Sequence, residues 1–271
     1  MPQSQIWTVL SLLKASSEFF AQKNIDDARL NAELLLAHTL NIKRMDLYLK
    51  FDMPVSDDER QAFRGLCKRR LEGEPVQYII GNQDFFGLTL DVDSRVLIPR
   101  PETELLVEEA LNALSLVTLG DEKINILDIG TGSGCIALAL AAKLSTAEIL
   151  AVDVSPEALA LAKRNAEKNK LSSEVNFLTA DALSEHFYAE VEGSYHLIIS
   201  NPPYIPIQER DSLQVEVRNF EPAIALFVKE GFEFYEKIAR EAKRLLVPTG
   251  LLCFELHAEG AAEVEMILRK Y

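Results

Sequence analysis

The sequence predicts an α/β protein in which a doubly wound parallel sheet follows a small all-helical domain and a β-hairpin linker. Three observations lead to this fold class. Residues 1–74 carry apolar side chains at helical spacing, residues 75–98 contain short alternating apolar segments, and residues 99–271 alternate between strand and helix patterns. A chain of 271 residues can form two domains of unequal size, so we expect a helical domain at 1–74, a linker at 75–98 and an α/β domain at 99–271.

Three amphipathic helices are expected in residues 1–74. Apolar residues at helical spacing mark the first two: Ile6, Val9, Leu10, Leu13 and Phe20, then Leu34, Leu35 and Leu40. Asp26 and Asp27 are candidate N-caps of the second helix. The third begins at a capping box formed by Ser56 and Glu59 and ends near Gly73. Its basic cluster (Arg64, Lys68, Arg69 and Arg70) is interpreted as a solvated face, with contact to RNA or a partner as the alternative.

The linker has the pattern of a β-hairpin. Val76–Ile80 is an apolar segment rich in β-branched residues, and Leu88, Leu90 and Val92 alternate after Gly87.

From Pro101, which opens a helix through Leu114, helices and strands follow one another regularly. The expected strands are Ile124–Ile129, Glu148–Val152, Val175–Leu178, Leu197–Ser200 and Leu251–Glu255. The expected helices are 133–144, 156–169, 232–246 and 259–270. This alternation is typical of a doubly wound sheet.

Composition and charge exclude several classes of protein. The net charge is −14, and residues 76–271 hold 17 basic and 31 acidic side chains, so a nucleic-acid partner is not expected. The longest apolar run, Cys135–Ala142, is far shorter than the roughly 20 residues of a membrane span. The first residues carry no basic segment of a signal peptide. We therefore expect a cytoplasmic protein without a membrane partner.

The cysteines and histidines give no sign of a disulfide framework or a metal site. Three cysteines form no C-x-x-C pair, and the four histidines have no ligand spacing with them or with each other.

The segment Asp128–Gly134 (DIGTGSG) links a predicted strand directly to a predicted helix. Glycines in this setting let the backbone approach a nucleotide-like ligand at the helix N-terminus, and a plain glycine-rich turn is the alternative. A dinucleotide fingerprint requires a third glycine at the position of Cys135, so hydride-transfer cofactors are disfavoured.

Two acidic residues follow the next two strands. Asp153 can accept both hydroxyls of a ribose, and its alternatives are a solvated strand end or the N-cap of the helix opened by Pro156. Asp181 can face an adenine amino group or be an ordinary loop residue.

The segment Asn201-Pro202-Pro203-Tyr204 follows the fourth strand. The prolines fix the backbone, so the segment presents carbonyl acceptors beside an amide oxygen and an aromatic ring. It can bind a planar NH₂ group, and a stiff turn is the alternative. Glu255 and His257 are interpreted as polar residues at the end of a strand, with a catalytic role as the alternative.

Together these motifs resemble the class I, S-adenosylmethionine-dependent methyltransferases, which have a Rossmann-like fold. Within them, the chain resembles the HemK-type (PrmC) release factor glutamine methyltransferases, which modify proteins of translation termination. Segments matching that family run through nearly the whole chain: Asp26–His38, Gly73–Gly81, Phe85–Gly87 and Ile98–Glu104.

The resemblance implies the substrate and the roles of the site residues. S-adenosyl-L-methionine is the implied cofactor, held by Gly130, Thr131, Gly132, Ser133 and Gly134 at its methionine part, by Asp153 at its ribose and by Asp181 and Ala182 at its adenine. Asn201, Pro202, Pro203 and Tyr204 bind the glutamine of a release factor. Asn201 also borders the cofactor, and Asn201, Pro202 and Tyr204 are the expected catalytic residues.

The sequence departs from the family pattern at two places. Ala182 stands where the family often has an aromatic residue, so no stacking on adenine is expected there. The family also continues after the helix at 259–270 with an antiparallel strand pair, whereas this sequence ends at Tyr271, so we expect either that one edge of the sheet is absent or that the chain is truncated.

Two other functions are compatible with the motifs. A nucleic-acid amino methyltransferase can use the same Asn-Pro-Pro-Tyr segment on a flipped base, but the negative charge and the helical domain argue against it. A regulator that binds the cofactor without catalysis is disfavoured by the intact segment Asn201–Tyr204.

Overall fold

The computed structural model of the protein describes residues 6–116, 123–229 and 231–271. The chain forms two compact units. Unit 1 contains the chain up to Gly81 together with Val215–Phe220, and unit 2 contains Asn82–Gln214 and Glu221–Tyr271. In the described residues no helix is both long and apolar enough to cross a membrane.

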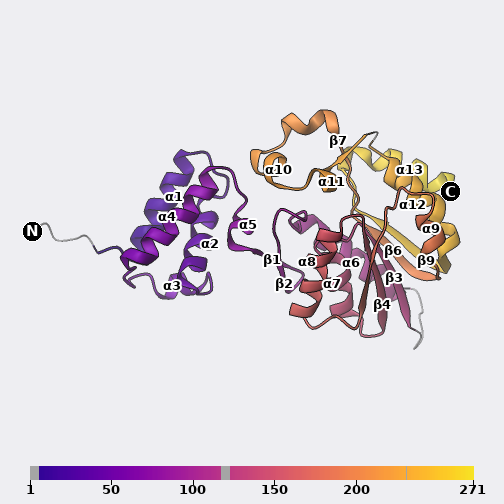
Figure 1. The fold of residues 1–271 in the computed structure, drawn as a ribbon, viewed down its shortest axis with the longest axis horizontal. Coiled ribbons are helices and arrows are strands. Elements are labelled where there is room, and N and C mark those ends of the chain that lie inside the picture. The colour runs from indigo at the N-terminus through magenta and orange to yellow at the C-terminus, as the bar shows by residue number, and fades with distance from the viewer. Residues whose placement is uncertain (1–5, 117–122, 230) are drawn as a thin grey trace, which may run out of the picture. The chain divides into compact units, whose positions relative to one another are not determined.

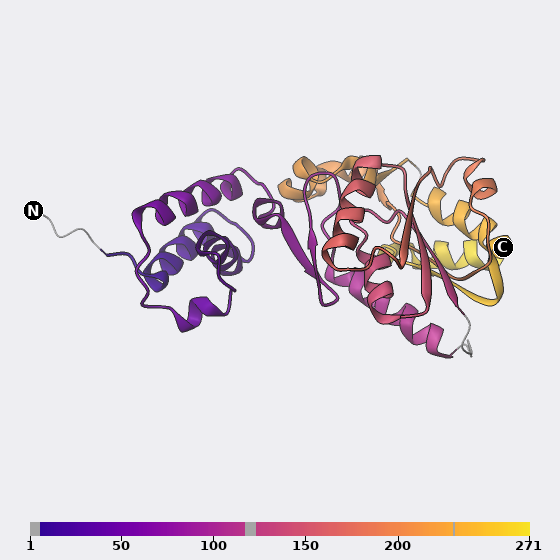
Figure 2. The ribbon, with the colours of Figure 1, turned by 60° about the horizontal axis from the view of Figure 1, so that its bottom comes forward.

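Unit 1 is helical (Figure 1). Its elements are α1 (Val9–Gln22), α2 (Ala28–Leu40), α3 (Asp46–Leu49), α4 (Asp57–Leu71), α5 (Val76–Ile80) and α10 (Val215–Phe220). Phe20, Leu35, Leu36 and Phe63 are buried at its centre and belong to one apolar cluster. Figure 2 shows from a second side how the indigo and purple helices pack around one another.

The ends of the helices in unit 1 confirm one expected cap and correct another. At α4 the Ser56 hydroxyl accepts a hydrogen bond from the Glu59 backbone N–H, and the Glu59 carboxylate accepts one from the Ser56 N–H at 2.8 Å. Asp27 precedes α2 with a φ of +48°, and its side chain makes no capping hydrogen bond. Instead, the Asn31 amide donates to the carbonyls of Asp26 and Asp27 at 3.0 and 3.2 Å.

The solvated face expected for the basic cluster of α4 is wrong for Arg70, which is only 6% exposed. Its guanidinium donates to Asn31 Oδ1 at 2.7 Å and forms an ion pair with Glu216 of α10. A buried charge is tolerated when it has such partners. Arg70 is therefore an internal anchor of unit 1.

The strand pattern of Val76–Ile80 was misleading, because these residues form the short helix α5. Val76 and Ile79 are buried in the core of unit 1, and a spacing of three places them on one helix face. Gly81 ends the helix with a φ of +77°. Packing in the core thus overrides the β propensity of this segment. The predicted hairpin is formed by the residues that follow, as the antiparallel strands β1 (Asn82–Phe85) and β2 (Leu88–Asp91).

Unit 2 contains the expected parallel sheet. Its strands are β3 (Ile124–Ile129), β4 (Ala147–Asp153), β5 (Val175–Thr179), β6 (Tyr195–Ser200) and β9 (Leu246–Phe254). They are parallel and lie in the order β5-β4-β3-β6-β9. The chain runs outward from β3 in one direction and then continues from β6 in the other. The loops after β3 and β6 therefore diverge at a topological switch point, where open α/β sheets bind ligands.

Helices cover both faces of this sheet (Figure 1). One face packs on α6 (Pro101–Leu116), α7 (Cys135–Lys143) and α8 (Pro156–Lys168), and the other on α9 (Phe187–Glu190) and α12 (Glu233–Leu245). Along β3, Ile126 belongs to the first core and Leu127 to the second, as the two-residue period of a strand requires. The doubly wound fold is confirmed, and the predicted ends of its main strands and helices are displaced by a few residues at most places.

The remaining elements of unit 2 are short, apart from the helix near the end of the chain. They are β7 (Ile205–Pro206), η1 (Ile207–Ser212), α11 (Ala223–Leu226), β8 (Phe227–Val228), η2 (Ala258–Gly260) and α13 (Ala261–Lys270). β7 pairs with β8 in a small parallel ladder just after the Asn201–Tyr204 segment.

Candidate functional site

A cavity of about 300 Å³ lies at the carboxyl ends of the central strands. Loops after four strands line it and contribute sequence-predicted residues: Gly130, Thr131, Gly132 and Ser133 after β3, Asp153 at the end of β4, Asp181 and Ala182 after β5, and Asn201, Pro202 and Pro203 after β6. The volume is at the lower end of the range for small-molecule sites. Over the described ranges, no group of three His, Cys, Asp or Glu side chains is placed to hold a metal ion.

The glycine loop after β3 folds back over the end of β4. The backbone N–H groups of Gly130 and Thr131 donate to the Val152 carbonyl at 2.8 and 2.9 Å, and the Gly132 N–H donates to Asp153 Oδ2 at 2.8 Å. Gly132 has a φ of +54°, and a Cβ added there would meet no atom within 4 Å. The loop therefore presents open backbone to the cavity, which suits a ligand that approaches closely.

Gly134 differs from the other glycines of the loop. It has a φ of +83° at the N-cap of α7, and an added Cβ would lie 3.2 Å from Ala162 Cβ and 3.3 Å from Leu138 Cδ1. It does not belong to the described residues that line the cavity. Its small size thus serves the packing of α7 on α8.

Asp153 holds the glycine loop and borders the cavity. In addition to the bond from Gly132, its Oδ1 accepts the Ser155 N–H at 2.9 Å. The N-cap of α8 is Ser155, whose hydroxyl accepts the Ala158 N–H at 3.1 Å, so the alternative that Asp153 is the N-cap is wrong. Burial raises the pKa of Asp153, while the bonded backbone N–H groups lower it. Each carboxylate oxygen retains a lone pair for a ligand hydroxyl.

Asp181 and Ala182, which follow β5, also line the cavity. Asp181 is exposed and accepts the Leu183 N–H at 2.9 Å, whereas Ala182 is 7% exposed. The arrangement leaves a carboxylate at the rim and a small apolar side chain inside it.

The Asn201–Tyr204 segment leaves β6 at the switch point without a cis peptide bond. The Asn201 amide donates from Nδ2 to Thr103 Oγ1 at 3.2 Å. Tyr204, in contrast to the three residues before it, does not line the cavity in the described structure. Its ring centre lies 6.3 Å from that of His257, and burial raises the pKa of its hydroxyl.

The segment just before α6 and the first turn of that helix form a further wall, and no role was expected for their residues from the sequence. Pro99, Arg100 and Thr103 line the cavity. Arg100 donates at 2.5 Å to Glu221, whose side chain is 1% exposed and also accepts the Ile98 N–H at 3.3 Å. No local sequence pattern indicates this pair, because its partners are far apart in the chain.

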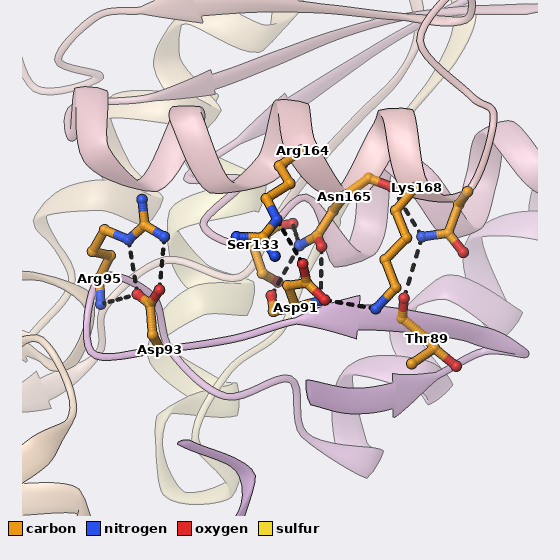
Figure 3. A network of polar contacts seen from close by, with 9 residues as sticks. Thr89, Asp91, Asp93, Arg95, Ser133, Arg164, Asn165 and Lys168 are labelled. Carbon is orange, nitrogen blue, oxygen red and sulfur yellow. Dashed lines mark hydrogen bonds and ion pairs between the residues drawn. The ribbon is translucent and has the colours of Figure 1, made fainter. Parts of the chain in front are cut away.

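Asn165 of α8 connects the hairpin to the glycine loop (Figure 3). It is fully buried, and its Oδ1 accepts the Asp91 N–H at 2.7 Å. Its Nδ2 donates to the carbonyls of Asp91 and Ser133 at 3.0 and 2.9 Å. Lys168 and Arg164 pair with the Asp91 carboxylate at 2.6 and 2.8 Å. A polar residue on the apolar face of a helix was the available signal, because buried amides are hydrogen-bonded.

The fully buried Asp128 predicts a pH-dependent stability. Burial raises its pKa to about 7, although the Thr131 hydroxyl donates to its carboxyl at 2.6 Å. The folded protein therefore holds this proton more tightly than the unfolded chain, and the group destabilises the fold increasingly as pH rises from about 4 to about 7. The variant Asp128→Asn has no charge to bury. We expect its free energy of unfolding in urea, relative to wild type, to rise by about 2–3 kcal/mol between pH 5 and pH 8. A difference that does not change with pH would contradict this account.

Comparisons with known proteins cover both parts of the chain. The model of the PrmC N-terminal domain matches residues 11–81, and that of the methyltransferase small domain matches residues 102–234. A release factor glutamine methyltransferase of Chlorobaculum tepidum is 51% identical over 99% of this chain and 92% of its own length. One from Geobacter sulfurreducens is 41% identical over 97% of this chain and 88% of its own length.

Solved structures show the same fold at lower sequence identity. The hMettl16 catalytic domain has a TM-score of 0.55 and 21% identity, over 79% of this chain and 72% of its own. A human methyltransferase 10 domain containing protein has a TM-score of 0.50 and 22% identity, over 68% of this chain and 79% of its own. These likenesses show the methyltransferase fold, whereas the curated relatives match both units along nearly their whole length. The chain thus belongs to the family of release factor glutamine methyltransferases, which are S-adenosylmethionine-dependent enzymes.

Proposed function

We propose that the cavity of unit 2 binds S-adenosyl-L-methionine and the target glutamine side by side. The observation that carries this proposal is the convergence, at one switch point, of the open glycine loop, the Asp153 carboxylate and the Asn201–Pro203 segment. Gly130, Thr131, Gly132 and Ser133 hold the methionine part, Asp153 accepts the ribose hydroxyls, and Asp181 and Ala182 flank the adenine. Gly134 acts indirectly, through the packing of α7.

The chemistry of the reaction makes positioning the main task of the protein. When bound, the cofactor supplies a methyl group that its sulfonium already activates. The nitrogen of a glutamine amide is a poor nucleophile, because its lone pair is delocalised into the carbonyl. Correct orientation of reacting groups can lower a barrier by roughly 7–11 kcal/mol.

The Asn201–Tyr204 segment can supply this orientation. The Asn201 side-chain oxygen and the Pro202 carbonyl accept the two N–H groups of the glutamine amide, and Pro203 keeps the backbone rigid. Tyr204 completes this segment on the substrate side and is proposed to pack on the plane of the glutamine amide, although its side chain does not line the cavity described above. The proton leaves to water after methyl transfer.

The protein substrate needs a larger contact than the cavity provides. We propose that the helical domain, residues 1–74, recognises the release factor, because it carries none of the cofactor motifs and matches the family's N-terminal domain. Release factors work at the ribosome, so we place the reaction in the cytoplasm.

Replacing Asp153 tests the cofactor site. We expect Asp153→Ala to weaken S-adenosylmethionine binding by about 1–3 kcal/mol in calorimetry, because a charged acceptor of hydrogen bonds is lost. Glu148→Ala is the matched control, since Glu148 is an exposed acid near the opposite end of β4. Equal affinities of wild type and Asp153→Ala would remove Asp153 from the site.

A further inference from the structure

The Asn201 amide is held by two successive hydrogen bonds whose other partners have no role in the proposed mechanism. Asn201 Nδ2 donates to Thr103 Oγ1 at 3.2 Å, and the Thr103 hydroxyl donates to Glu255 Oε2 at 2.7 Å. Thr103 lies in the first turn of α6 and is 2% exposed. Glu255 follows β9 and is held by its backbone, whose N–H donates to the Ser200 carbonyl at 3.0 Å and whose carbonyl accepts the Tyr235 hydroxyl at 3.0 Å.

The chemistry of the three groups fixes the direction of both hydrogen bonds. An ionised carboxylate only accepts hydrogen bonds, and a threonine hydroxyl has one proton to donate. Once Thr103 gives that proton to Glu255, its oxygen can only accept from Asn201. A flipped Asn201 amide would place Oδ1 against the Thr103 oxygen, with no proton between them. The amide is therefore fixed with Nδ2 toward Thr103 and Oδ1 at its other end.

We infer that Thr103 and Glu255 are positioning residues that fix the Asn201 side chain so that its Oδ1 accepts an N–H of the substrate glutamine. This inference rests on the proposed function, in which Asn201 binds that amide. Neither residue is assigned a role in the reaction by the motifs of the sequence. Glu255 acts on Asn201 indirectly, through Thr103, because it is not among the described residues that line the cavity, whereas Thr103 and Asn201 are.

Opposing influences act on the pKa of Glu255. Burial is the main reason that its pKa lies above the usual value, and hydrogen bonds from the Thr103 and Asn201 side chains oppose the rise. Arg100 lowers the pKa and Glu102 raises it, so two charges of opposite sign act on this carboxylate. The hydrogen bond from Thr103 lowers the pKa, but burial outweighs it, so the direction of the hydrogen bonds rests on the geometry of the Thr103 hydroxyl between Asn201 and Glu255.

The test compares Thr103→Val, which has the same shape but no hydroxyl, with Thr103→Ser, which restores the hydroxyl. The rate of a single turnover on release factor, at saturating S-adenosylmethionine, should fall by about 10- to 100-fold in Thr103→Val. It should recover to within about threefold of wild type in Thr103→Ser, since the donor and acceptor are restored. The dissociation constant for S-adenosylmethionine and the melting temperature should change little in either variant. A wild-type rate in Thr103→Val would overturn the inference.

A double variant separates positioning from general stability. Because Thr103 acts through Asn201, Thr103→Val should slow the Asn201→Ala enzyme by less than about twofold. An equal slowing in both backgrounds would show that Thr103 supports the fold alone. If Thr103→Val does not fold, Glu255→Gln provides the same test. The glutamine amide can donate a hydrogen bond to Thr103, which frees the Thr103 proton and permits the Asn201 amide to flip. We therefore expect a rate about tenfold lower than that of wild type. A wild-type rate in Glu255→Gln would then overturn the inference.

The outcome also distinguishes this inference from the proposed function. If Asn201→Ala methylates release factor at the wild-type rate, the proposed function of Asn201 fails. If Asn201→Ala is slow while Thr103→Val and Glu255→Gln are not, only the positioning role fails.

Discussion

Replacing Asn201 by alanine is expected to slow methylation of release factor by about 10²–10³-fold, the usual effect of losing one preorganised polar group. The amide nitrogen of glutamine becomes more positive as the new bond forms, so an acceptor aimed at its N–H group stabilises the transition state more than the bound substrate. The loss should therefore fall on turnover, with little change in the affinity for S-adenosylmethionine. Transfer of labelled methyl groups in single turnovers measures the rate, with tRNA and DNA as parallel substrates that we expect to remain unlabelled.

Two further variants sharpen this prediction. Asn201→Asp keeps an acceptor but loses the N–H that binds Thr103, and its charge can attract the sulfonium into a nonproductive position, so we expect it to be slow as well. Asn112→Ala on the exposed side of α6 is the matched control and should behave like wild type. If Asn201→Ala turns over as fast as wild type, the Asn201–Tyr204 segment is only a stiff turn.

The parts of the fold that the sequence predicts well are those with a strong period. β3 is an exception: both of its faces are covered by helices, so Ile124–Ile129 has no alternating pattern and is predictable as a short, largely apolar segment just before the glycine loop. The helix α5 was not predicted, because five residues are too few to establish a period. The burial of Val76 and Ile79 decides the conformation of this segment. The short elements between β6 and α12 likewise have no period of their own.

In the candidate site, too, residues marked by local sequence motifs are predictable, whereas residues defined by partners distant in sequence are not. The glycine loop, Asp153 and the Asn201–Pro203 segment are predictable, since each follows a strand and the carboxyl ends of parallel strands meet at one edge. Thr103, Asn165 and Glu255 were not predicted as site residues. Their partners lie 98, 74 and 152 positions away in sequence, so only the folded chain brings them together. Gly134 lies in the predicted motif, but its packing on Ala162 also depends on a neighbour in space.

Removal of the helical domain is expected to abolish detectable methylation of intact release factor while S-adenosylmethionine binding persists. A stable protein interface buries about 800 Å² on each partner, and a cavity of this size cannot supply that area. We therefore expect the 75–271 fragment to lose at least about 100-fold in kcat/KM for release factor, equivalent to roughly 3 kcal/mol of binding. A short peptide carrying the target glutamine should be methylated equally slowly by the fragment and the full chain, because it does not reach the helical domain.

A substitution in the full chain checks the same prediction without truncation, which would leave Val215–Phe220 without the rest of unit 1. Large apolar side chains are exposed around α3, among them Leu49 at 79% and Phe51 at 53%, and exposed apolar groups of this kind mark contact surfaces. We expect Leu49→Asp to raise the KM for release factor about tenfold and to leave kcat and peptide methylation unchanged. Met266→Asp on α13, where the side chain is 63% exposed, is the matched control in unit 2. Unchanged methylation of release factor by the 75–271 fragment would show that unit 2 alone recognises the substrate, and the helical domain would then need another role.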